Sequence, residues 1–234
     1  MSVVGCRVVT ARRQPVTDNR QPITDFMSDS AADDHMPKGR IETLADWVFA
    51  IAMTLLAFNL QPPAFSIRDN RDLQTALLAM APHLKTYVLS FLVIGIYWIS
   101  HHFQFHYIHR ADRTLLWINV FFLMVVATLP FSTAVLGRYE RYQSAIVLYS
   151  VNLLLVGLVN AIHWAYVTHE RRLVAPDLSA QVVRITMARI LLAPSVAVLC
   201  IGISYINVAG AVNFYYTILI LYVLLARRGA QTVR

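Results

Sequence analysis

The sequence predicts an all-α fold, an integral membrane bundle of six helices, and three observations support that class. First, 57% of the 234 residues are hydrophobic and 14% are charged, with a mean hydropathy of +0.54, whereas soluble domains carry about a quarter charged residues. Second, six apolar runs are each long enough to cross a bilayer, which takes roughly 17–25 residues. Third, the basic residues follow the alternation that membrane topology requires. The six runs are 41–60, 84–105, 114–136, 144–167, 185–206 and 210–226.

The Lys and Arg residues are divided unequally between the two sides that these runs define. Because cytoplasmic connections carry the excess of Lys and Arg, and an even number of spans returns the chain to its starting side, we expect both termini in the cytoplasm and the protein in the cell membrane. The same asymmetry accounts for the net charge of +7 without a nucleic-acid partner. Ten lie on the N-terminal side (Lys38, Arg40, Arg110, Arg113, Arg171, Arg172, Arg184, Arg227, Arg228 and Arg234) and five on the other (Arg68, Arg71, Lys85, Arg138 and Arg141).

The two ends of the chain are expected to lie outside the membrane domain. Residues 1–38 mix basic and acidic residues with prolines and contain no apolar run, so they predict a flexible cytoplasmic tail and no signal peptide. Residues 39–228 form the predicted six-span domain, and 229–234 form a short cytoplasmic tail. The two cysteines, Cys6 and Cys200, predict no disulfide framework.

The first run, 41–60, carries the most polar residues and gives the main functional clue. It ends where Pro62 and Pro63 prevent a helix from continuing. Asp46 lies about 100° from the centre of an almost entirely apolar helical stripe. Ordinary helix packing explains such a stripe, but a carboxylate at membrane depth needs a partner and is a functional hypothesis by default. The stripe consists of Trp47, Ile51, Thr54 and Phe58.

Polar residues in the second and third runs are candidate partners for Asp46. Ser100, His101 and His102 lie near the cytoplasmic end of the second run, and Asn119 lies at a similar depth in the third. Hydrogen bonds among such groups join membrane helices. We therefore predict a structural polar network that connects the first three helices and is made of Arg40, Asp46, His101, His102 and Asn119.

The connection 61–83 is the only long one between runs, and it has room for one short amphipathic segment. Several aromatic residues are interpreted as membrane-interface residues, because Trp and Tyr are enriched there. They are Trp98, Trp117, Tyr107 and Tyr139, and His163 and Trp164 are interpreted as packing or interface residues.

Three histidines share one helical face, which raises the question of a metal site. His102, His106 and His109 have the spacing i, i+4, i+7. No suitably spaced carboxylate or thiolate completes a ligand set. We therefore predict neither a metal site nor a cofactor.

Three segments together resemble a known family. Residues 40–56 read RIETLADWVFAIAMTLL and resemble the first helix of the endosomal and lysosomal transmembrane potassium channels, in the single-repeat bacterial form. That family opens with Arg, three variable residues and Phe-Ser-Asp; Arg40 and Asp46 match, whereas Leu44 and Ala45 replace the Phe-Ser pair. The segments 98–105 (WISHHFQF), 116–119 (LWIN) and 129–133 (LPFST) resemble the second and third helices, and the resemblance extends over roughly 38–226.

The resemblance implies a homotetramer in the lipid bilayer, with the first helix lining a pore for potassium ions. The sequence lacks the Thr-Val-Gly-Tyr-Gly filter of the usual potassium channels. By position in the family, Ile51 forms the constriction, Thr54 a hydroxyl layer and Phe58 a further ring, with Trp47 at the inner mouth. These residues are the stripe that the helical period defines.

Two other function classes stay open at this point. A proton-coupled or ion-coupled transporter would use Asp46 and His101 as a relay, although no inverted repeat is visible. A membrane enzyme would need a nucleophile with matched partners, and Ser100, Ser150 and the histidines lack them. The expected function is a potassium-permeable channel that is not an enzyme.

Overall fold

The computed structural model describes residues 38–61 and 67–231, with side chains up to residue 221. These residues belong to one compact unit, 35–234. Apart from turns and connecting segments, the described residues form helices and one isolated antiparallel bridge between Ile108 and Val174. Most of the predicted tail 1–38, including Cys6, lies outside the described residues.

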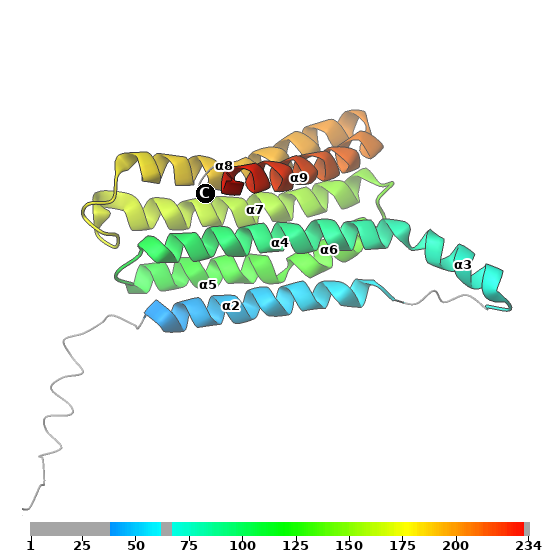
Figure 1. Ribbon diagram of the computed structural model, residues 1–234, viewed down its shortest axis with the longest axis horizontal. Coiled ribbons are helices and arrows are strands. Elements are labelled where there is room, and N and C mark those ends of the chain that lie inside the picture. Colours follow the sequence, from blue (N-terminus) through cyan, green and yellow to red (C-terminus); the bar gives the residue numbers. More distant parts are fainter. Residues whose placement is uncertain (1–37, 62–66, 232–234) are drawn as a thin grey trace, which may run out of the picture. The chain divides into compact units, whose positions relative to one another are not determined.

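Eight α-helices and two short 3₁₀ helices make up the described residues (Figure 1). They are α2 (Lys38–Leu55), η2 (Leu56–Asn59), α3 (Asn70–Ala79), α4 (Ala81–Tyr107), α5 (Arg113–Ala127), α6 (Leu129–Arg138), α7 (Gln143–Thr168), η3 (His169–Arg171), α8 (Ala180–Ile206) and α9 (Val208–Gln231). The predicted runs correspond to α2 with η2, α4, α5 with α6, α7, α8 and α9. The segment expected in the long connection is α3.

Side-chain caps fix where several helices begin. The carboxylate of Asp69 accepts a hydrogen bond from the backbone N–H of Asp72, and that of Asp112 from Leu115, at 2.8 Å each. Ser179 caps α8 in the same way, so α8 begins at Ala180, before the apolar run 185–206 that it contains. Such caps satisfy backbone N–H groups that a helix start leaves unpaired.

The third predicted span is two helices, which corrects the expectation of one helix over 114–136. The break falls at Thr128, directly before the first turn of α6, where Pro130 has no N–H to donate. At the break, the carbonyl of Val125 accepts from the backbone N–H of Thr128 at 3.2 Å and from the Thr128 hydroxyl at 2.7 Å. A local bend at membrane depth is tolerated when side chains satisfy the freed backbone groups.

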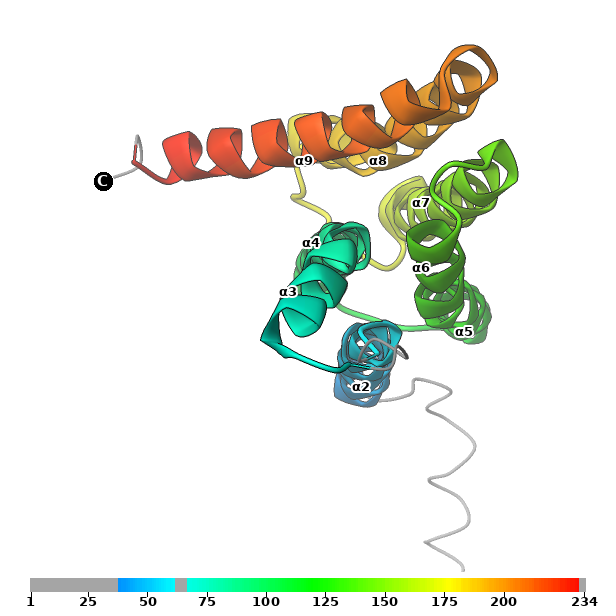
Figure 2. The same ribbon diagram turned by 90° about the vertical axis from the view of Figure 1, so that its right-hand side faces the viewer.

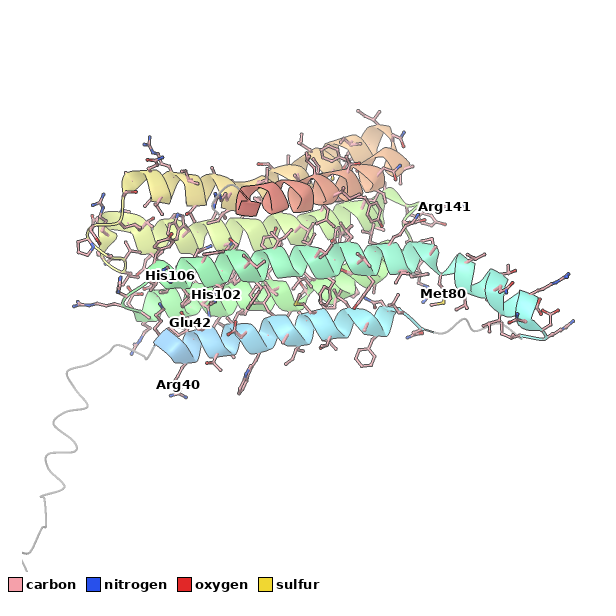
Figure 3. All side chains as sticks on the ribbon, in the orientation of Figure 1. Arg40, Glu42, Met80, His102, His106 and Arg141 are labelled. Carbon is pink, nitrogen blue, oxygen red and sulfur yellow. The ribbon has the colours of Figure 1, made fainter. Side chains whose placement is uncertain are left out.

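Consecutive long helices run in alternating directions, as Figure 1 shows. The start of α2, the α4–α5 connection and the α7–α8 connection therefore lie at one end of the bundle, called here the inner end. The basic residues divide between the ends as predicted for the described residues; Figure 3 shows Arg40 at the inner end and Arg141 at the opposite one.

Five helical segments among the described residues are long and apolar enough to cross a membrane: 38–59, 81–107, 113–138, 143–171 and 180–206. The described side chains of α9 form a shorter apolar stretch, 208–221. Its helical backbone continues to residue 231, beyond the domain boundary expected at 228. The count of six spans therefore stays an expectation.

Helix α7 is at the centre of the packing, against α5 and α6 on one side and α8 on another (Figure 2). The approach of α8 is close at Gly157, where an added Cβ would lie 2.7 Å from Cδ of Pro194. A glycine at this position allows the two helices to touch. The two largest fully buried side chains, Trp164 and Tyr149, also lie on α7.

Candidate functional site

Helix α2 packs by one narrow face and leaves the opposite face uncovered. Its buried face contacts α4 and α5, with Phe49 against the rings of His101 and Phe122 at centroid distances of 6.0 and 5.9 Å. In Figure 2, α2 lies at the edge of the bundle below α4 and α5. The buried residues are Ile41, Ala45, Phe49 and Ala52, followed by Leu56 at the start of η2.

The uncovered face is the stripe that the helical period predicts, called here the α2 stripe: Trp47, Ile51, Thr54 and Phe58. Trp47 is 67%, Ile51 57% and Phe58 73% exposed, and Thr54 is exposed as well. A single chain thus presents a row of large apolar side chains with one hydroxyl among them. In a membrane such a row contacts lipid or another protein surface.

The hydroxyl of Thr54 has its proton engaged. Oγ1 donates to the carbonyl oxygen of Ile51 at 2.9 Å, and a hydroxyl has one proton to donate and two lone pairs to accept with. Thr54 therefore presents an oxygen acceptor on the α2 stripe. An oxygen acceptor suits a cation and does not suit an anion.

Asp46 is bonded to a residue that the sequence analysis assigned to the membrane interface. Its Oδ1 accepts from the indole Nε1 of Trp98 at 2.8 Å, and Trp98 stacks on His102, with ring centroids 5.8 Å apart. The indole N–H can only donate, so it needs an acceptor within reach. Asp46 thereby joins α2 to α4 and lies off the α2 stripe.

His101 is bonded to Asn119, with His101 Nε2 and Asn119 Oδ1 2.9 Å apart and both side chains buried. This bond joins α4 to α5. Arg40 is exposed and forms no ion pair or hydrogen bond with the described residues, and it points away from the bundle in Figure 3. The residues predicted to form one network therefore form two separate pairs, with Trp98 as the added partner and Arg40 apart.

A second group of buried polar residues was missed by the sequence analysis. Gln104 Oε1 contacts His163 Nδ1 at 2.7 Å, and Gln104 Nε2 donates to Asn160 Oδ1 at 2.7 Å. Asn160 Nδ2 in turn donates to Ser100 Oγ at 3.1 Å. His163, interpreted from sequence as a packing or interface residue, is a fully buried member of this chain. The available signal was the occurrence of Gln104 and Asn160 within apolar runs, since amides at membrane depth need partners.

The described residues contain no group of three His, Cys, Asp or Glu side chains that could hold a metal ion. His102 is engaged with Trp98, and the backbone N–H of His109 donates to Leu173. Helix α2 thus offers one oxygen acceptor, from Thr54, on an otherwise apolar face. The Asp46–Trp98 and His101–Asn119 bonds lie away from that face and join α2, α4 and α5.

Comparisons with known proteins find relatives of the segment that contains α2, α4 and α5. The family model described as "Endosomal/lysosomal potassium channel TMEM175" matches residues 40–130, which include the α2 stripe, Trp98, His101 and Asn119. A potassium channel of Streptomyces collinus is 36% identical over 173 residues, 72% of this chain and 83% of that protein. The human endosomal/lysosomal proton channel TMEM175 is 30% identical over 112 residues, 45% of this chain and 22% of that protein.

A solved structure has a similar fold over most of the chain. It is the crystal structure of a lysosomal potassium-selective channel TMEM175 homologue from Chamaesiphon minutus, with a TM-score of 0.70 and 27% identity. The match covers 80% of this chain and 96% of that one.

Proposed function

Because this chain belongs to the TMEM175 family, whose relatives are channels and not enzymes, we propose that it is a potassium-permeable channel whose permeation path is lined by the α2 stripe. One observation carries the proposal. The helix that holds the family's first motif buries one face in its own chain and leaves Trp47, Ile51, Thr54 and Phe58 uncovered. The potassium-channel relatives make potassium the proposed permeant ion.

A single chain cannot enclose a path with one helix, so the stripe needs copies of itself. Four chains around an axis beside α2 bring four equivalent stripes together, and closed cyclic symmetry is the usual arrangement of identical subunits. The proposal is therefore a homotetramer in the lipid bilayer. It has no resident cofactor, only the permeant potassium ion.

Ile51 is the proposed constriction. Four isoleucine side chains on one axis form an apolar ring that expels water, which is how hydrophobic gates block ions. A small outward movement admits an ion that has lost part of its water. The four Thr54 hydroxyl oxygens, one turn away, replace part of that hydration and favour potassium, which is cheaper to dehydrate than sodium.

The neighbouring positions have supporting roles in this proposal. Trp47, one turn toward the inner end, narrows the inner mouth, and Phe58 adds a ring toward the outer end. Asp46 and His101, bonded to Trp98 and Asn119, hold α2 and α5 against α4 from outside the path. No carbonyl filter is involved.

The proposed topology follows the basic residues. The inner end has Lys38, Arg40 and the arginines of the α4–α5 and α7–α8 connections, so we place it in the cytoplasm, with both termini and six spans in the cell membrane.

Proton transport is the second candidate, because the mammalian relatives are named proton channels. In that case protons would move through Asp46 and His101. The two side chains are bonded to different partners, Trp98 and Asn119, which favours a structural role for both.

Potassium flux into liposomes tests the proposal against the alternative that α2 faces lipid. Ile51→Asn makes the ring polar, so we expect flux to rise about tenfold or more as the dewetting barrier falls, and discrimination against sodium to weaken. Thr54→Ala should mainly lower potassium selectivity. Leu199→Asn is the matched control, since Leu199 on α8 is 55% exposed against 57% for Ile51.

Equal flux in the Ile51→Asn and Leu199→Asn variants would remove the α2 stripe from the path. Flux that requires a pH gradient and ignores the potassium gradient would favour proton transport.

A further inference from the structure

We propose that an anionic phospholipid binds in the groove between α4, α8 and α9, with its phosphate on Arg189 and one acyl chain along the groove. This site is independent of the α2 stripe, which lies on another face of the chain.

Arg189 is a cation inside an apolar helix. It is the tenth residue of α8 and lies about 13 Å along the helix axis from Ala180, within the run that the sequence predicts to span the membrane. It is exposed and forms no ion pair or hydrogen bond with any described residue. An arginine at such depth is costly without a partner and marks a functional site by default.

The groove beside Arg189 is apolar over most of its length. It has a volume of about 290 Å³, near the lower limit for ligand pockets. Its inner part contains Arg189, Thr186, Ser100 and Tyr107, whereas its deeper part is lined by aliphatic residues such as Val93 and Val196. The cation therefore lies at the inner end of the groove, and the deeper part is apolar except for Tyr97 and Tyr215, whose hydroxyls are bonded to the Leu153 carbonyl and to Ser150.

The dimensions fit one lipid chain. From Thr186 to Val196 the helix rises about 15 Å, which is half the roughly 30 Å hydrocarbon thickness of a bilayer. An acyl chain whose headgroup lies beside Arg189 would thus follow the groove to the middle of the membrane.

The positive charge of Arg189 favours a lipid with an anionic headgroup. A guanidinium binds phosphate oxygens with two parallel hydrogen bonds, and basic pockets between membrane helices are typical sites for anionic headgroups. Since no described carboxylate pairs with Arg189, a lipid with a net negative charge neutralises it. A zwitterionic lipid adds an ammonium of its own, and an uncharged apolar molecule would leave the guanidinium unpaired.

The test counts lipids bound to the purified channel by native mass spectrometry, with phosphatidylglycerol and phosphatidylcholine of identical acyl chains. We expect the unmodified protein to retain phosphatidylglycerol preferentially. A single basic residue contributes roughly 1 kcal/mol to anionic lipid binding, so Arg189→Gln should lower phosphatidylglycerol retention roughly fivefold. Arg184→Gln is the control, because Arg184 is an exposed arginine of the same helix that does not line the groove.

A second pair of variants tests the groove without touching the charge. Ala193 lines the groove and Ala188 does not, so Ala193→Phe should reduce retention of both lipids and Ala188→Phe should not. If Arg189→Gln fails to assemble, the comparison of Ala193→Phe with Ala188→Phe still tests whether lipid binds in the groove. Unchanged retention in Arg189→Gln or in Ala193→Phe, or an equal loss in Arg184→Gln, would overturn the proposal.

Discussion

Helices α2 and α7 are both long enough to cross a membrane, but they use their side chains in opposite ways. Helix α7 is the most buried of the five spanning segments, and its polar residues are bonded to side chains of neighbouring helices: Tyr149, Ser150, Asn152, Asn160 and His163. Helix α2 is in one of the least buried segments and makes one such bond, from Asp46; in η2, which follows it, Asn59 donates to the backbone carbonyl of Pro130. Helix α2 therefore leaves a face uncovered by its own chain, whereas the polar residues of α7 are used inside it.

This contrast separates the scaffold from the surface that we propose lines the permeation path. Buried hydrogen bonds in a membrane protein are kept because an unpaired polar group has no water to bond with. The α2 stripe has no such constraint from its own chain, so its residues can be exchanged at little cost to folding. Substitutions should thus affect stability on α7 and transport on α2.

The largest effect is expected at the contact between α7 and α8. Gly157→Leu places a side chain where Pro194 is already 2.7 Å from the Cβ position, so the helices must separate and little monodisperse protein should be obtained. Gly202→Leu on α8 is the control, because nothing lies within 4 Å of its Cβ position. Size-exclusion chromatography measures both. Similar yields would show that α7 is not the rigid centre of the packing.

A smaller effect is expected from the polar chain that α7 shares with α4. Gln104→Leu leaves Asn160 Oδ1 and His163 Nδ1 without their partner, at about 1–3 kcal/mol for each unsatisfied group. Thermal unfolding in detergent should show a clearly lower midpoint. Ile51→Leu, on the exposed stripe, is the comparison and should change the midpoint little. An equal loss in the two variants would remove the distinction between the helices.

The smallest effect on stability is expected at Asp46, on α2 itself. Asp46→Ala removes the acceptor of the Trp98 indole at a cost of about 1 kcal/mol or less, whereas Asp46→Asn keeps an acceptor oxygen and should retain more stability. Potassium selectivity should stay unchanged in both variants. Normal assembly with altered selectivity in liposome flux would put Asp46 in the permeation path and contradict its structural role.

The lengths of the apolar runs predict most of the helices, and periodicity predicts that the four stripe residues share one face. The 3.6-residue repeat places Trp47, Ile51, Thr54 and Phe58 together whatever surrounds them, and the structure leaves these four exposed. The break between α5 and α6 also had a local signal in Pro130, although hydropathy passes smoothly through it.

The sequence alone does not predict the hydrogen-bond partners of the polar residues, because these depend on which helices are neighbours. Asp46 meets Trp98 and not His101 because of the rotation of α4 about its own axis, and hydropathy does not encode that rotation. His163 is bonded to Gln104 because α7 lies beside α4. The sequence did not single out Arg189 for the same reason. The groove beside it forms only when α4, α8 and α9 pack together.

The contact of Gly157 with Pro194 has a consequence for how this chain can change over evolutionary time. The proline ring occupies the space that any larger residue at position 157 would need. Position 157 therefore cannot change alone: a lineage that acquires a side chain at 157 must first lose the ring at 194. Among homologous sequences, these two sites should co-vary as one inherited unit, even though they are distant in the chain.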